Sequence, residues 1–481
     1  MLVRVWPNWK TRVKTNPLLV ILTTSHVLFA MFLGELYALA PDEGGYLTTF
    51  NDVYSLPINT DAQGHSGWIT APTIFLWIVY LPAKILNLVG IPGYLSVRML
   101  SILLTVFSAY LLLKVLKQDG VTSKRVSLLC IAPFFIPSVF LWTSLGLRES
   151  FIITEITMIL IGFNFIFQER VRVGLTLIFI GSYGLISTKT YLWVCVEIAI
   201  FMTCVILFKR IRLRKILQIS FAAFALPLII FASTTSQYAL NFILQSNISS
   251  AGGRSGDSIS RVEVLESLTG TTGTTGTTGT TGTTGTTGTT IVTFHGDYSL
   301  VALRSYIESN PNAFATQVLN FFQVDNKIEA IWNEKIEIAL LSEEKEVGSS
   351  NSSLSGHILN PGRISNPPSM LKAAFRFLLE PSPFGMNLGF AASVAALESP
   401  LWCLFYALVL FSIFRWRNNK IFRDPPVILA IILILGIVAF SALVEVNLGT
   451  AFRHRSILVA PLVFLYVRLH EINKNGYKVA S

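Results

Sequence analysis

Charged residues are scarce in this chain of 481 residues, because Asp, Glu, Lys and Arg together make up only 13% of it. A soluble globular protein carries about 25% charged residues, so the composition excludes an ordinary water-soluble domain. Hydrophobic residues make up 52%, and several apolar runs approach the roughly 20 residues that a helix needs to cross a bilayer. Helices satisfy their own backbone hydrogen bonds, which lipid cannot do. The sequence therefore predicts an all-α polytopic membrane protein.

Cysteine is also rare, and the positions of the four cysteines exclude two further classes of protein. They are Cys130, Cys195, Cys204 and Cys403. All four lie in apolar runs, and they form neither a CxxC pair nor the spacing of a metal centre or disulfide framework. We interpret them as ordinary packing residues of helices. The chain also lacks a dinucleotide-binding fingerprint, and no cofactor is expected.

The net charge of +10 does not indicate a nucleic-acid partner, because the basic residues gather in short blocks between apolar runs. Such blocks follow the positive-inside rule, which places them in the cytoplasm. The N-terminal stretch with Arg4, Lys10, Arg12 and Lys14 is one of them. Three others are "QERVR" (168–172), "KRIRLRK" (209–215) and "RWRNNKIFR" (415–423). We expect a multi-pass protein of the cytoplasmic membrane with both termini inside.

About ten spans satisfy this rule, if the apolar run 71–90 is not one of them. If 71–90 crossed the membrane, "KQDGVTSKR" (117–125) would face outward, against the rule. We therefore expect 71–90 to lie on or dip into the outer face, although both placements remain open. The expected spans are 17–40, 93–116, 126–146, 150–168, 172–189, 191–208, 215–233, 396–415, 426–445 and 457–469.

Three regions follow from this topology. They are a transmembrane core (1–233) with a first outer loop (41–92), an extracytoplasmic segment (234–395) and C-terminal transmembrane helices (396–481). The middle segment contains a Thr/Gly repeat (269–290), which offers no apolar core and is interpreted as a flexible insertion. Apolar residues at helical spacing predict amphipathic helices in this segment over 298–322, 326–344 and 369–385.

An acidic pair, Asp42 and Glu43, follows the first apolar run in the stretch "PDEGGYL". Charges inside a membrane span are costly and are functional candidates, and this pair lies just past the outer end of the first expected span. A solvated loop or the start of a helix is the alternative interpretation, because acidic residues are common at helix N-termini.

A basic cluster, Arg453, His454 and Arg455, lies in "EVNLGTAFRHRS" (445–456), just before the expected last span. "NLGT" is typical of a turn, so we expect a loop on the outer face. Loops this basic usually lie inside, which favours a function over simple solvation.

Further charges fall at the same outer ends. They are Arg98, Arg148, Glu149 and Lys189. An alternative interpretation of Arg148 and Glu149 is a local salt bridge in a hairpin. An alternative for Arg98 is that its side chain snorkels to the membrane surface. Together with the acidic pair and the basic cluster, they place carboxylates and cations at one face. Arginine suits the recognition of phosphate, and a carboxylate suits a general base.

The chain resembles the GT-C fold glycosyltransferases, integral-membrane enzymes with lipid-phosphate sugar donors that include the protein mannosyltransferases and the lipid A aminoarabinose transferases. The similarity lies in the acidic motif "PDEGGYL" after the first span, and in a helix that opens with an arginine, "GYLSVRMLSILLTVFSAYLLLKVLK". The stretch "IPSVFLWTSLGLRESFI" is also similar to the family's third and fourth spans, so the likeness covers roughly the first 230 residues.

The resemblance implies that Asp42, with Glu43 beside it, is the general base that acts on an acceptor hydroxyl or amine. The donor would be a polyprenyl-phosphate sugar, and the acceptor a lipid, glycan or protein on the outer face. Cations would stabilise the leaving phosphate; the candidates are Arg148, Lys189, Arg453 and Arg455, with Arg98, Glu149 and His454 as further substrate-binding residues. The chain has no clear second acidic motif of the oligosaccharyltransferase type, so a divalent metal is not implied. Synthesis of a cell-surface polysaccharide would be the context.

Two alternatives remain open. A polysaccharide polymerase or ligase of the O-antigen type would use outer-face arginines to hold a lipid pyrophosphate, and "FRHRS" fits that activity. A lipid-linked glycan flippase would instead place charges along a path through the membrane midplane, but the main membrane acids, Glu155 and Glu197, lie nearer the outer halves of their spans. Paired broken helices in matching halves, which mark many transporters, are not evident.

Overall fold

The computed structural model describes residues 16–34, 82–118, 124–208, 211–231, 367–381, 395–416, 424–445 and 448–474. All regular elements in these ranges are helical, and six helices are long and apolar enough to cross a membrane. These six are Gly93–Val115, Glu149–Phe167, Val171–Thr188, Leu213–Phe231, Pro425–Leu443 and Leu448–His470. The expectation of an all-α membrane protein is confirmed.

The other four expected spans also coincide with helices, although they are shorter or bent. Three are the apolar helices α1 (Pro17–Leu33), α9 (Thr190–Ile206) and α18 (Ser399–Trp416). The fourth is a bent pair, formed by α5 (Lys124–Ile131) and α6 (Pro137–Ser144). The helical segments therefore follow the expected order, and the number that crosses the membrane stays a prediction.

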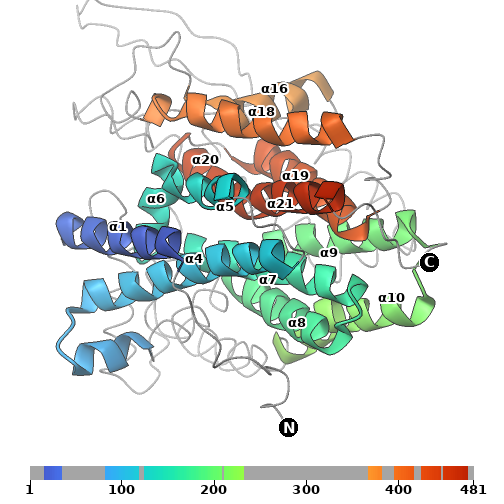
Figure 1. The fold of residues 1–481 in the computed structure, drawn as a ribbon, viewed down its shortest axis with the longest axis horizontal. Coiled ribbons are helices and arrows are strands. Elements are labelled where there is room, and N and C mark those ends of the chain that lie inside the picture. The colour runs from blue at the N-terminus through green and yellow to red at the C-terminus, as the bar shows by residue number, and fades with distance from the viewer. Residues whose placement is uncertain are drawn as a thin grey trace, which may run out of the picture.

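Helix α7 (Glu149–Phe167) forms the centre of the bundle and is buried along nearly its whole length. It packs most extensively against α8 (Val171–Thr188) and also contacts α4 (Gly93–Gln118), α19 (Pro425–Val444) and α21 (Val459–Lys474) (Figure 1). The α7–α8 contact depends on glycine, because a Cβ built on Gly174 would lie 2.5 Å from the carbonyl oxygen of Gly162. Small residues permit such close approach between membrane helices.

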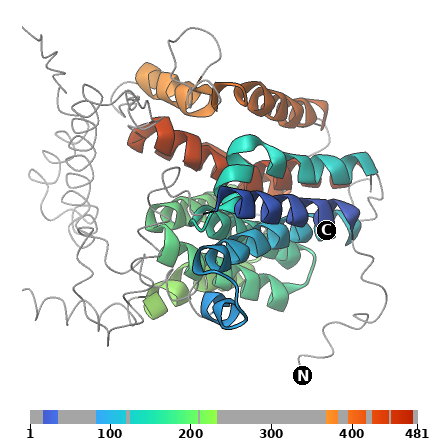
Figure 2. The same cartoon turned by 90° about the vertical axis from the view of Figure 1, so that its left-hand side faces the viewer.

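The remaining helices surround this centre. Helix α10 (Leu213–Ser220) continues through a π-helical turn, η4 (Phe221–Ala225), and lies beside α8. Helix α16 (Pro367–Leu379) packs against α19, and α18 packs against α21. Figures 1 and 2 show α16 and α18 together along one edge of the bundle. The expected helix over 369–385 is thus confirmed as α16, although it ends at Leu379.

Proline breaks the expected span 126–146. Helix α5 passes into a 3₁₀ turn, η3 (Ala132–Phe135), and α6 then leaves at an angle of 67°. Pro133 and Pro137 lie at the starts of η3 and α6. Because proline has no N–H to donate, a straight helix cannot pass through these positions without losing hydrogen bonds. A bent pair of helices thus lies where the span 126–146 is expected, and its crossing of the membrane stays a prediction.

The expected turn at "NLGT" was also wrong, because residues from Leu448 onward are helical. Helix α20 (Leu448–Arg455) continues through η7 (Ser456–Leu458) into α21. Leu448, Ala451 and Phe452 recur at helical spacing and are buried, so the apolar face of the last span begins earlier than its hydropathy suggests. The basic cluster consequently belongs to a helix rather than to a loop.

Several expectations fall outside the described residues. They concern Asp42 and Glu43, the part of the first outer loop up to residue 81, the Thr/Gly repeat 269–290 and the helices expected over 298–322 and 326–344. Of the run 71–90, the described part is helical over 82–88 and is followed by Gly90 with a positive φ of 87°.

Candidate functional site

Charged side chains from four helix ends meet at one end of the bundle. Helix α7 begins there, α8 ends there, α9 begins there, and the chain passes from the end of α19 into α20. We call the side chains that gather at these breaks the charged cluster. Its members are Arg148, Glu149, Lys189, Glu445, Arg453 and His454.

Arg453 and Glu149 form the strongest pair of the charged cluster. The Nε atom of Arg453 lies 2.5 Å from one carboxylate oxygen of Glu149, and an Nη atom lies 3.1 Å from the other. Such two-point contacts are stronger and more directional than single ones. Glu149 also starts α7, where the helix dipole favours a negative charge. The alternative of a local Arg148–Glu149 bridge did not anticipate this partner, which is 304 residues away in the sequence.

A second chain of contacts joins Glu445, His454 and Lys189. The Nδ1 atom of His454 lies 2.5 Å from a carboxylate oxygen of Glu445. The Nε2 atom of the same ring contacts the Nζ atom of Lys189. Because Glu445 accepts a hydrogen bond from Nδ1–H, the neutral ring presents the lone pair of Nε2 to the ammonium group of Lys189. The three side chains therefore form one continuous hydrogen-bonded line.

Lys189 is the single residue between α8 and α9, where its extended backbone (φ −156°, ψ 83°) breaks the two helices apart. Its ammonium group lies 5.1 Å from the ring centre of Tyr191. Burial lowers the pKa of Lys189 to about 7. The carboxylates of the cluster oppose this shift, and its two arginines reinforce it. Burial thus weakens the hold of Lys189 on its proton relative to an exposed lysine.

Arg148 completes the charged cluster at its rim, where it is half-buried and donates to the backbone oxygen of Thr188 at 3.2 Å. Three cationic side chains, with His454 between them, then face two carboxylates. Arg453 and His454 keep 15% and 12% of their side-chain surface exposed. A partly exposed site with an excess of positive charge suits an anionic ligand such as a phosphate.

Arg455 points away from the charged cluster, into a separate buried group. Its side chain is 0% exposed and lies 3.5 Å from the carboxylate of Glu398, and it donates to the backbone oxygen of Leu378 at 2.9 Å. Glu398 also accepts from the indole of Trp402 at 2.9 Å and from the backbone N–H of Ser138 at 2.6 Å. We call these five residues the Glu398 junction. It ties α20 to α6, α16 and α18.

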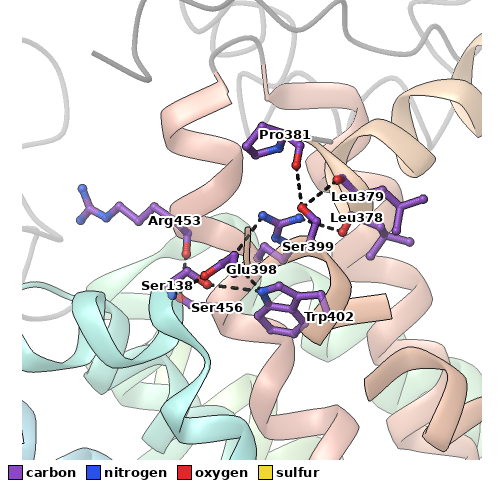
Figure 3. Close-up of polar contacts among 10 residues, drawn as sticks. Ser138, Leu378, Leu379, Pro381, Glu398, Ser399, Trp402, Arg453 and Ser456 are labelled. Carbon is purple, nitrogen blue, oxygen red and sulfur yellow. Dashed lines mark hydrogen bonds and ion pairs between the residues drawn. The ribbon is translucent and has the colours of Figure 1, made fainter. Parts of the chain in front are cut away.

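Figure 3 shows the Glu398 junction and, beside it, the side chain of Arg453 pointing the other way. Successive residues of a helix point about 100° apart, so Arg453, His454 and Arg455 reach three different sets of partners. The alternative of a solvated outer loop does not hold for Arg455, because its side chain is fully buried. Its predicted contact with substrate stays a prediction.

Arg98 does not snorkel either, since it is 0% exposed. It donates to the backbone oxygens of Ala30 and Gly34, at 2.9 and 2.6 Å. These groups lie at the C-terminus of α1, where helix carbonyls lack intrahelical partners and attract cations. Arg98 therefore fixes α1 against α4, and its predicted role in binding substrate stays a prediction.

Two of these residues were missed by sequence reasoning. Glu398 and Trp402 were not expected to act together, although Glu398 stands directly before the apolar run "SPLWCLFYALVLF". A carboxylate at such a boundary is costly unless it is paired, and this was the available signal.

Glu155, noted as a membrane acid, accepts a hydrogen bond from Thr188 at 2.7 Å and lies beside Gly184.

Comparisons with known proteins give no family for the chain: it matches no protein-family model, no curated protein and no solved structure. In the part of the chain that the structure describes, no three His, Cys, Asp or Glu side chains are grouped in a way that would hold a metal ion. What the fold and the site define is a helical membrane protein with a mixed-charge cluster at one end of its bundle.

Proposed function

We propose that the protein is a GT-C-like membrane glycosyltransferase that moves a sugar from a polyprenyl-phosphate donor to an acceptor on the outer face of the cytoplasmic membrane. The observation that carries the proposal is the charged cluster: Arg148, Lys189 and Arg453 are held together by three separate helix breaks. An assembly of cations at the end of a helical bundle suits a ligand whose phosphate lies at the membrane surface while its chain stays in lipid.

The distribution of basic residues supports the outer position of the cluster. Arg170, Arg212 and Lys215 lie at the helix ends opposite to it. If the positive-inside rule sets the orientation, the opposite ends are cytoplasmic and the charged cluster faces outward. Ten spans would then bring both termini inside.

In this proposal the cations hold and stabilise the phosphate while the bond between sugar and phosphate breaks. Preorganised positive charge in a water-poor site is one of the largest contributions to catalysis. The resemblance to GT-C enzymes assigns the general base to Asp42, with Glu43 beside it. Sugar transfer needs both parts, a base for the acceptor and a charge complement for the leaving group.

We expect Arg453→Ala to reduce sugar transfer by about 10² to 10³, the size of effect seen when one donor to a developing charge is removed. The assay would use purified protein, a panel of polyprenyl-phosphate sugars and acceptors extracted from membranes. Arg468→Ala is the matched control. Arg468 lies in α21, which continues from the helix of Arg453 through η7. Its side chain is also 15% exposed, and it also makes a two-point pair, with Asp424 at 2.9 and 3.2 Å.

The control separates chemistry from folding, because both variants leave a carboxylate without its arginine. Equal losses of transfer in the two variants, in step with their melting temperatures, would contradict a role for Arg453 in the reaction. Asp42→Asn tests the base in the same assay. If Asp42→Asn folds and binds donor but does not transfer, the GT-C assignment holds, and full activity of this variant would remove it.

A polymerase or ligase of the O-antigen type is the second candidate, and one observation favours it. The described residues of the charged cluster lie in or at the ends of α7 to α9, α19 and α20, and they include two arginines and a histidine. An enzyme that relies on arginines and a histidine alone would need no more than this. The combination of an active Asp42→Asn variant with an inactive Arg453→Ala variant would select this candidate.

A further inference from the structure

We propose that Lys189 is the general acid of the site, which protonates the phosphate as it leaves the sugar, and that His454 and Glu445 position Lys189 and hold its proton. This inference rests on the proposed sugar transfer. It adds an acid that protonates the leaving phosphate. This acid is distinct from the carboxylate that would take the proton of the acceptor.

The geometry supplies the first argument. Lys189 ends a hydrogen-bonded line in which Glu445 holds Nδ1 of His454 and Nε2 of His454 contacts Nζ of Lys189. Glu445 is buried, with 3% of its side chain exposed, whereas Lys189 is half-buried at the other end of the line. The line thus runs from the buried carboxylate of Glu445 to the less buried Lys189, whose ammonium group carries a proton that can be transferred.

The protonation states supply the second argument. Lys189 and His454 cannot both be fully protonated and keep their contact, because two N–H donors do not bond to each other. The pair therefore shares one proton, either as lysine ammonium with neutral imidazole or as neutral amine with an imidazolium that Glu445 stabilises. A proton lost from Lys189 to a ligand is replaced from water, because Nε2 of the neutral ring carries no proton to give.

The acidity of Lys189 suits this task. Its pKa of about 7 lies close to the second pKa of a phosphate monoester, about 6. General acids are most effective when their pKa lies near the working pH. The two arginines of the cluster stay charged under all relevant conditions, so they can attract the phosphate but cannot protonate it. Lys189 differs from these two arginines because it can both attract the phosphate and give it a proton.

The groups around Lys189 come from every element that meets it. Glu149 begins α7 with Arg148 directly before it, Glu445 ends α19, Arg453 and His454 belong to α20, and Tyr191 lies in α9. The two carboxylates favour the ammonium form, and the two arginines favour the amine form. An incoming phosphate adds negative charge, which strengthens the hold of Lys189 on its proton until the phosphate itself takes it.

The proposed step balances as follows. The bond between the anomeric carbon and the phosphate oxygen breaks, and a bond from the anomeric carbon to the acceptor oxygen or nitrogen forms. The acceptor's proton goes to the general base. The phosphate oxygen that leaves takes a proton from Nζ of Lys189, so the lipid phosphate departs as a monoanion. Lys189 regains a proton from water.

Lys189→Arg gives the decisive test, because arginine keeps the positive charge and cannot act as an acid. We expect this variant to bind polyprenyl phosphate like the wild type and to transfer sugar about 10² to 10⁴ more slowly, the usual contribution of a general acid or base. Wild-type transfer should fall as the pH rises through about 7, where Lys189 loses its proton. The remaining transfer by Lys189→Arg should lack that fall.

The same variant can overturn the proposal. If Lys189→Arg transfers sugar as fast as the wild type and shows the same fall at alkaline pH, Lys189 acts only as a fixed charge. His454→Gln and Glu445→Gln address the positioning residues. We expect both to move the alkaline limb of the pH profile, whereas a purely structural role would lower the rate at every pH alike.

A second measurement keeps the inference separate from the proposed function. Reductive methylation with formaldehyde labels neutral amines, and mass spectrometry of the Lys189 peptide reports its labelling against pH. We expect labelling of the wild type to rise near pH 7 and to rise at a different pH in His454→Gln. Labelling that begins only at the pH of an ordinary lysine overturns the inference, even if sugar transfer is confirmed. Labelling as expected, with no sugar transfer by any donor, leaves the shared proton established and rejects the proposed function.

Discussion

Glu398→Ala should destabilise the protein by about 3–5 kcal/mol, the cost of removing one partner from a buried ion pair. Arg455 would remain fully buried, and its partners among the described residues would be the backbone oxygen of Leu378 and its aromatic neighbours. The indole of Trp402 and the N–H of Ser138 would lose their common acceptor as well. Thermal unfolding in detergent micelles measures the effect.

A matched control lies on the neighbouring helix. Glu380 pairs with Arg376 at 2.7 Å, but both side chains keep about a quarter of their surface exposed, at 24% and 23%. Pairs of this kind contribute about 0–1 kcal/mol, so Glu380→Ala should leave the melting temperature nearly unchanged. The double variant Glu398→Leu/Arg455→Leu should recover much of the stability lost by Glu398→Ala, because no charge is left buried. Equal melting temperatures for Glu398→Ala and Glu380→Ala would contradict the burial of the Glu398 junction.

Gly174→Val is expected to force α7 and α8 apart. A Cβ on Gly174 would lie 2.5 Å from the carbonyl oxygen of Gly162 and 2.6 Å from the side chain of Ile166. Overpacking of a well-packed interior typically costs about 1–3 kcal/mol and sometimes more, and here one of the clashing atoms belongs to the backbone. We expect a marked fall in folded yield and in melting temperature.

The shift should also reach the charged cluster, because α7 begins with Glu149 and α8 ends just before Lys189. Gly436→Val is the control, since Gly436 lies within α19 and a Cβ there meets no atom within 4 Å. We expect this variant to keep its stability. If Gly174→Val is as stable as Gly436→Val, the two helices do not approach as closely as the structure shows.

The general architecture was accessible from the sequence, because the cost of placing polar groups in lipid is local. Each apolar run identifies a helix without reference to any other part of the chain. The short basic blocks then indicate which helix ends lie together. For this reason the sequence placed Arg148, Lys189 and Arg453 at one end of the bundle, where the structure finds them.

The breaks within helices were less accessible. Pro133 and Pro137 lie in a run that is apolar enough for one span, and the 67° bend between α5 and α6 was not anticipated. At "NLGT" the turn-forming residues led to the prediction of a turn, although Leu448, Ala451 and Phe452 recur at helical spacing. Packing decided otherwise, because burial of these apolar side chains favours helix where local propensity does not.

The sequence by itself determined that this is a helical membrane protein, the order of the helices that the structure describes, and the gathering of Arg148, Lys189 and Arg453 at one end of the bundle. Tertiary structure alone decided their partners: Glu149 with Arg453, His454 with Lys189 and Glu445, and Arg455 with Glu398. Hydropathy and charge bias act over one helix and its flanks, so they can be read along the chain. Pairing depends on how each helix is rotated and how closely it approaches its neighbours, which is fixed by contacts such as the one between Gly162 and Gly174.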